Sequence, residues 1–169
     1  MSRITFKGNP VETVGSLPAV GTTAPDFRLT KEDLSDVGLK DFQGKIKILN
    51  IFPSLDTGVC AASVKRFNEE IARHPDVVVL NISNDLPFAM KRFCEQYQIS
   101  RAVSLSNLRR GDTDFGRLYG VAFQSGPMVG LLSRAVVVVD GSNKVLYTEQ
   151  VPEIAQEPDY SKALAAIKR

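Results

Sequence analysis

One stretch, residues 46–60, constrains the fold of this chain more than any other. It begins with an apolar, β-branched run at residues 46–52, whose length and composition are typical of a buried strand. A short loop containing a proline and a glycine follows, and residues 61–73 then place apolar side chains at helical spacing. A strand that leads through a short loop into a helix is the repeating unit of α/β sheets. We therefore expect an α/β fold organised around this unit.

Strand and helix patterns continue in both directions from this unit. We expect strands at residues 4–7, 11–14, 27–30, 46–52, 77–83, 102–105, 135–140 and 145–151. We expect helices at residues 61–73, 86–97, 112–119 and 160–168, the third of them starting at Asp112 or Thr113. This order predicts a mostly parallel central sheet flanked by helices and made mixed by an antiparallel edge hairpin. A thioredoxin-like domain with an N-terminal β-hairpin has this order, and we expect one such domain over residues 1–169.

Composition excludes several classes of partner. The net charge is only +2, and the Lys and Arg residues are scattered among Asp and Glu, so we expect neither nucleic-acid binding nor membrane-surface binding. The longest purely apolar run, residues 135–139, is too short to span a bilayer. Residues 1–10 lack the apolar segment of a secretory signal, so we expect a cytoplasmic protein.

The chain has two cysteines, Cys60 and Cys94. The plainest interpretation is two buried, reduced and inert thiols. With the single histidine, His74, they lack the spacing and the fourth ligand of a zinc site, so we expect no bound metal. Cys60, however, falls at or near the first turn of the expected helix, where unpaired N–H groups and the helix dipole make a thiol easier to ionise. Because the thiolate is the nucleophile, Cys60 is the candidate for chemistry.

The segment Pro53-x-x-x-Thr57-x-x-Cys60 resembles the active-site signature of the peroxiredoxins. Residues 20–27 are similar to the N-terminal approach motif of that family. Arg134, just ahead of the expected strand at 135–140, is similar to its active-site arginine.

A longer string, residues 56–64, most resembles the bacterial thiol peroxidases, a subgroup of atypical peroxiredoxins with two cysteines. Cys94 falls where this subgroup has its second cysteine, whereas Gly58 stands where many members have proline. The resemblance covers nearly the whole chain. It implies a peroxiredoxin fold and a cofactor-free enzyme that reduces hydrogen peroxide and alkyl hydroperoxides, with a preference for the latter.

The resemblance gives each motif residue a role that its chemistry suits. Cys60 attacks the terminal peroxide oxygen, and negative charge shifts across the peroxide as the O–O bond breaks. Arg134 supplies a permanent cation that favours both the thiolate and this developing charge. The Thr57 hydroxyl can donate to the peroxide or accept from it. Pro53 has no N–H and can shield the sulfur from water.

Each of these residues also has a plainer interpretation. Thr57 could be only a helix N-cap. Arg134 could be a solvated residue that guards the end of an apolar strand. Pro53 could be an ordinary turn residue. Residues 120–132 carry Val121, Phe123, Met128 and Leu131, which could form an apolar pocket wall or could be buried in the core or in a dimer interface.

Cys94 could be a small residue at the edge of the core, but the resemblance implies that it resolves the Cys60 sulfenic acid as an intrachain disulfide. The resemblance also implies thioredoxin as the reductant and a homodimer formed near the active-site loops. A disulfide requires Cα atoms within about 7 Å of each other. If both cysteines lie in intact helices they are too far apart, so we predict that one or both helices unwind during turnover.

Other cysteine chemistries fit less well. In a Cys–His hydrolase the histidine reaches the thiol, but His74 lies at the far end of the expected helix, roughly 20 Å away at about 1.5 Å per residue. The chain has no Cys-x-x-Cys motif for disulfide exchange. The remaining alternative is a redox sensor, in which oxidation of Cys60 signals to a partner without turnover.

Overall fold

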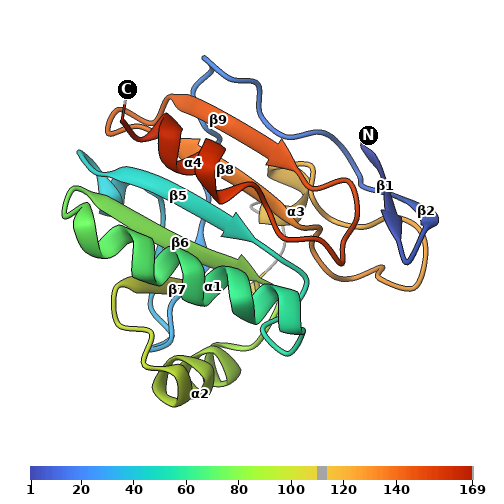
Figure 1. Ribbon diagram of the computed structural model, residues 1–169, viewed down its shortest axis with the longest axis horizontal. Coiled ribbons are helices and arrows are strands. Elements are labelled where there is room, and N and C mark those ends of the chain that lie inside the picture. The colour runs from blue at the N-terminus through green and yellow to red at the C-terminus, as the bar shows by residue number, and fades with distance from the viewer. Residues whose placement is uncertain (110–113, 169) are drawn as a thin grey trace.

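The structure is a computed structural model that describes residues 1–109 and 114–168, and it confirms the α/β class (Figure 1). Its strands are β1 (Arg3–Phe6), β2 (Asn9–Glu12), β3 (Leu29–Thr30), β4 (Asp36–Val37), β5 (Ile46–Ile51), β6 (Val77–Ser83), β7 (Ala102–Ser106), β8 (Ala135–Val139) and β9 (Val145–Gln150). Its helices are η1 (Leu39–Phe42), α1 (Gly58–Glu70), η2 (Ile71–Arg73), α2 (Pro87–Tyr97), α3 (Phe115–Leu118) and α4 (Tyr160–Ala166). The proposed helix starts Asp112 and Thr113 lie outside the described residues, and α3 is instead capped by Asp114.

The central sheet is mixed, with strand order β4-β3-β7-β6-β5-β8-β9. Within the described part of the chain, only the pairs β5–β6 and β6–β7 are parallel, so the expectation of a mostly parallel sheet was wrong. Parallel neighbours need a crossover connection, and α1 and α2 supply the two that this sheet has. On one side, β8 runs antiparallel to β5, and β9 runs antiparallel to β8. On the other side, β3 runs antiparallel to β7, and β4 runs antiparallel to β3.

Two layers cover the sheet. On one face α1 and α4 pack against the same strands, and the rings of Phe67 and Tyr160 meet edge to face at 5.1 Å between centroids. The other face is covered by α3 and by the segment that precedes β3, with Phe27 against Phe115. Figure 1 shows α1 and α4 in front of the sheet and α3 behind it. Among the described helices, none is long and apolar enough to cross a membrane.

The N-terminal hairpin is confirmed as the separate two-stranded sheet β1–β2. Its turn is made by Lys7 and Gly8, both with positive φ, a conformation that glycine adopts without strain. The hairpin's buried side chains, Ile4 and Val11, pack against Phe123.

Several apolar side chains of the connection between α3 and β8 pack into the core, although other residues of this connection, such as Val129, are exposed. Val121 is fully buried in the main cluster, and Met128 and Leu131 pack partly buried against the hairpin cluster. For Val121, Phe123, Met128 and Leu131, burial therefore accounts for the apolar side chain better than an apolar pocket wall does.

Candidate active site

Cys60 is the third residue of α1, and its side chain is fully buried. It packs in an apolar cluster with Phe52, Leu55 and Val64. The predicted position at the helix's first turn is therefore confirmed. There the backbone N–H groups have no intrahelical acceptor, and the positive end of the helix dipole favours a negatively charged sulfur.

Arg134 points directly at this sulfur. Its Nη2 donates to Cys60 Sγ at 3.2 Å, and its Nε donates to the carbonyl of Ile154 at 2.8 Å. Arg134 is only 2% exposed, so the interpretation of a solvated residue is wrong. Its Nη1 is also buried and has no hydrogen-bond partner among the described residues. A buried donor without an acceptor is costly, and here it is available for an acceptor on a bound substrate.

The sheet register explains why two residues so distant in sequence meet. Strand β8 runs antiparallel to β5, with Ala135 opposite Ile51 at the end of the pair. Arg134, just before β8, therefore lies next to the loop that leaves β5 and leads into α1. The backbone of Arg134 is fixed as well, since its carbonyl accepts from Val151 N at 3.0 Å and from the side chain of Gln150 at 2.9 Å.

Thr57 and Pro53 lie on that same loop. Thr57 occupies the N-cap position of α1, but its side chain makes no capping hydrogen bond. Its hydroxyl instead donates to the carbonyl of Ser54 at 3.2 Å, so capping does not explain the residue. Thr57 borders a cavity of about 260 Å³ between the start of α1 and α2. Pro53 is buried.

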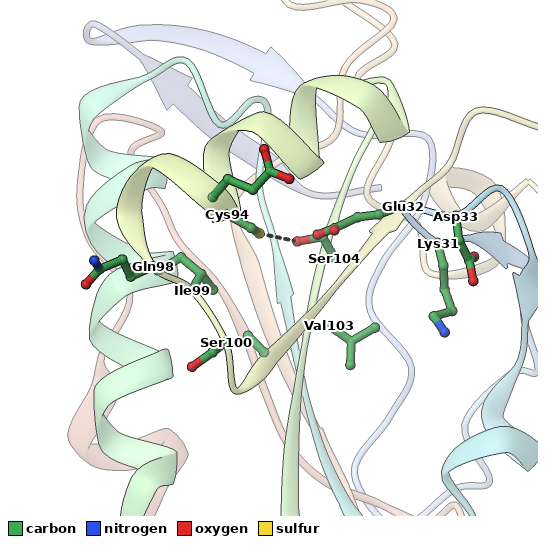
Figure 2. A pocket seen from close by; sticks show the side chains of 11 residues that line it. Lys31, Glu32, Asp33, Cys94, Gln98, Ile99, Ser100, Val103 and Ser104 are labelled. Carbon is green, nitrogen blue, oxygen red and sulfur yellow. Dashed lines mark hydrogen bonds between the residues drawn. The ribbon is translucent and has the colours of Figure 1, made fainter.

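Cys94 lies in α2 and makes its polar contact on β7 and not with Arg134 or Thr57. Figure 2 shows its sulfur directed toward Ser104 on β7, where the two side chains are 3.3 Å apart. The thiol borders a cavity of about 620 Å³. Burial raises the pKa of the Cys94 thiol to about 11, the Ser104 hydrogen bond opposes this, and the carboxylates of Glu32 and Glu95 raise the pKa further.

Ser104 and Glu32, which modify the effect of burial on the pKa of the Cys94 thiol, were not predicted from the sequence. A weak signal exists for Ser104, because a hydroxyl side chain inside an apolar strand must find a buried partner. Glu32 has no such signal. It lies on the turn after β3, and only the pairing of β3 with β7 brings it to Cys94.

Both cysteines are free thiols in intact helices, and the side chains of Met90 and Phe93 belong to the apolar cluster that contains both. The condition for the predicted unwinding is thus met, and the unwinding itself stays a prediction.

Known proteins resemble this chain in both sequence and structure. The family model described as Redoxin matches residues 19–164. A thiol peroxidase of Mycobacterium tuberculosis is 51% identical over 167 residues, 99% of each chain. A thiol peroxidase of Leptospira interrogans is 48% identical over 166 residues, 98% of this chain and 97% of the other. Among solved structures, a peroxiredoxin-like protein from Aquifex aeolicus superposes with a TM-score of 0.91 at 38% identity, covering 99% of this chain and 96% of its own.

Proposed function

The chain belongs to the redoxin family and, within it, to the thiol peroxidases, and from that premise we propose that Cys60 is the peroxidatic residue. Thiol peroxidases reduce peroxides at the expense of thiols. The proposed substrates are hydrogen peroxide and alkyl hydroperoxides, and the proposed site consists of Cys60, Arg134, Thr57 and Pro53, with Cys94 as the resolving residue.

The observation that carries the proposal is the contact between Arg134 Nη2 and Cys60 Sγ at 3.2 Å. The thiolate of Cys60 attacks the terminal peroxide oxygen, the O–O bond breaks, and the second oxygen leaves with the bonding pair as hydroxide or alkoxide. Protonation then gives water or an alcohol, and Cys60 is left as a sulfenic acid. The guanidinium pairs with the thiolate, and its second nitrogen, Nη1, can donate to the oxygen on which charge develops.

Cys94 completes the cycle in this proposal. Its sulfur attacks the sulfenic sulfur of Cys60, the S–O bond breaks, and the two protons leave with the oxygen as water. The product is an intrachain Cys60–Cys94 disulfide. A dithiol protein of the thioredoxin type then reduces it by thiol–disulfide exchange through a mixed disulfide.

We also propose that the protein acts in the cytoplasm as a homodimer. The apolar side chains of Leu86 and Phe88 at the start of α2 are 53% and 65% exposed, and they offer a surface near the active-site loop for a second copy. Sedimentation equilibrium of the wild type and of Phe88→Asp tests this assembly. A wild type that sediments as a monomer would exclude the homodimer.

Peroxide consumption by the wild type, Cys60→Ser and Cys94→Ser, each supplied with a thioredoxin and its reductase, tests the activity. The wild type should turn over repeatedly on both hydrogen peroxide and tert-butyl hydroperoxide. Cys60→Ser should consume no peroxide. Cys94→Ser should consume one equivalent and then recycle poorly with thioredoxin.

The same experiment separates the enzyme from a redox sensor. If the wild type consumed only one equivalent of peroxide in the presence of a competent reducing system, the sensor would be favoured. If Cys94→Ser turned over like the wild type, resolution by Cys94 would be wrong while the peroxidatic role of Cys60 would stand.

A further inference from the structure

Asp85, which the proposed mechanism does not use, connects the loop before Cys60 to the segment before α2. It is half-buried between β6 and α2. Its Oδ1 accepts from Ser54 Oγ at 2.8 Å, and its Oδ2 accepts from the backbone N of Leu55 at 2.8 Å and from Ser83 Oγ at 2.6 Å. Ser54 and Leu55 lie on the loop that joins β5 to α1. One carboxylate thus takes two donors from the loop that carries Thr57.

Helix capping does not account for Asp85. An aspartate just before a helix commonly accepts hydrogen bonds from the first N–H groups of that helix. Here the N-cap position of α2 is Leu86, and the three donors to the Asp85 carboxylate all lie outside α2. The side chain serves the active-site loop and not its own helix.

Ser54, which is held by Asp85, is in turn hydrogen-bonded to Thr57. The carbonyl of Ser54 accepts from both the backbone N and the hydroxyl of Thr57, at 3.3 and 3.2 Å. The Ser54 hydroxyl also accepts from the backbone N of Asp56 at 3.1 Å. Fixing Ser54 therefore fixes the turn that ends at Thr57 and begins α1.

Asp85 is itself held by the sheet. Its backbone carbonyl accepts from Ser106 Oγ at 2.5 Å, and its backbone N donates to Ser83 Oγ at 3.2 Å. Ser83 and Ser106 end the neighbouring parallel strands β6 and β7. The anchor of Asp85 is thus independent of the helix that carries Cys94.

We propose that Asp85 is a positioning residue for the peroxide step. It acts through Ser54 to hold Thr57 and the first turn of α1 in the arrangement in which Cys60 reacts with the peroxide. This inference rests on the proposed function of Cys60. Misplacing a reacting group by about 1 Å can slow a reaction by up to roughly a hundredfold, so a loosened loop is costly. Because the anchor is on the sheet, α2 can unwind while Asp85 still holds the loop, and Asp85 should matter little for disulfide formation.

The test is a double-mutant cycle with Asp85→Asn, Ser54→Ala and the variant that combines them. Asparagine has nearly the shape of aspartate, but its NH₂ group accepts no hydrogen bond. Depending on how the amide is oriented, either the Ser54 hydroxyl or both Leu55 N and Ser83 Oγ lose their acceptor. Single-turnover reaction with tert-butyl hydroperoxide, quenched with an alkylating reagent and analysed by mass spectrometry, reports Cys60 oxidation and disulfide formation separately. We expect each single variant to lower the oxidation rate constant about tenfold, and the combined variant to be no slower than the singles.

Asp26→Ala is the control. The Asp26 carboxylate also ties two segments together, but it holds the segment that covers the other face of the sheet. Its Oδ1 accepts from both Phe27 N at 2.9 Å and Leu39 N at 3.1 Å, and alanine removes this acceptor. Asp26→Ala should lower the melting temperature without changing the oxidation rate constant. A purely structural role for Asp85 would instead make Asp26→Ala and Asp85→Asn slow the reaction in proportion to their loss of stability.

The outcomes separate the positioning role of Asp85 from the proposed peroxidase function of Cys60, on which it rests. An inactive wild type would remove the proposed function. An active wild type with an Asp85→Asn variant that oxidises at the wild-type rate would overturn only the role of Asp85. Should Asp85→Asn fail to fold, a normal oxidation rate in Ser54→Ala would overturn it equally well. Slower disulfide formation in these variants, with normal oxidation, would also contradict it.

Discussion

The surroundings of the two cysteines differ in charge although both side chains are buried. Cys60 lies in the first turn of α1 and accepts a hydrogen bond from the guanidinium of Arg134. Cys94 lies in the second half of α2, beside the hydroxyl of Ser104 and near the carboxylates of Glu32 and Glu95. One sulfur is placed against positive charge and the other against negative charge.

This difference sets the order of the proposed reaction. In the proposed reaction the peroxide meets the sulfur that accepts from the guanidinium, while the raised pKa of Cys94 keeps the other sulfur protonated and unreactive in the folded, reduced protein. In the proposed cycle, Cys94 reacts only after α2 leaves this setting. On that proposal, the burial and the carboxylates around Cys94 would keep the second thiol from reacting before the first one is oxidised.

The largest expected effect is the pH dependence of Cys94 alkylation in the reduced Cys60→Ser variant. The pKa of Cys94 is about 11, and below the pKa the thiolate fraction rises about tenfold per pH unit. The rate of reaction with iodoacetamide should therefore increase roughly a thousandfold from pH 7 to pH 10 without a plateau. A plateau near pH 8, in protein shown by circular dichroism to be folded, would contradict the contrast between the two thiols.

Replacing Arg134 by methionine tests the other side of the comparison. The change removes the cation next to Cys60 and should slow oxidation by tert-butyl hydroperoxide about a hundredfold, comparable to the loss of one transition-state donor. The oxidation rate of Arg134→Lys should fall between those of the wild type and Arg134→Met, because lysine keeps the positive charge but lacks the two N–H-bearing Nη atoms of the guanidinium. Stopped-flow peroxide consumption measures both.

Arg66→Met is the control for this change. Arg66 lies on α1 but is paired with Glu70 on the exposed side of the helix, so its loss should leave the rate within about twofold of the wild type. An Arg134→Met variant as fast as Arg66→Met would show that the guanidinium is not needed at the sulfur.

Sequence reasoning captured the environment of Cys60 far better than that of Cys94. The position of Cys60 follows from a local pattern, a strand, a short loop and a helix, and the motif added Arg134. The direction of the Cys94 side chain depends on which strands lie next to α2, and the antiparallel pairing of β3 with β7 has no local signature. For the same reason the sheet was expected to be mostly parallel, and Asp85 was overlooked, since its partners lie on a distant loop.

Glu32→Gln should make Cys94 more reactive. The Glu32 carboxylate raises the pKa of the thiol, so its removal lowers that pKa and increases the thiolate fraction at any pH below it. In the Cys60→Ser background we expect alkylation at pH 8 to become about fivefold faster. Asp33→Asn is the matched control, because Asp33 borders the same cavity but its carboxylate accepts from Ser35, and it should leave the rate unchanged.

The smallest expected effect belongs to Ser104→Ala, and it has the opposite sign. The hydroxyl of Ser104 lies 3.3 Å from Cys94 Sγ and lowers the pKa of the thiol, so its loss should make alkylation of Cys94 about two- to threefold slower at pH 8. Ser100→Ala, another serine of the same cavity, should have no effect. Acceleration by Ser104→Ala would mean that access through the cavity, and not ionisation, limits the reaction of Cys94, and the charge contrast between the cysteines would then have to be sought in the carboxylates alone.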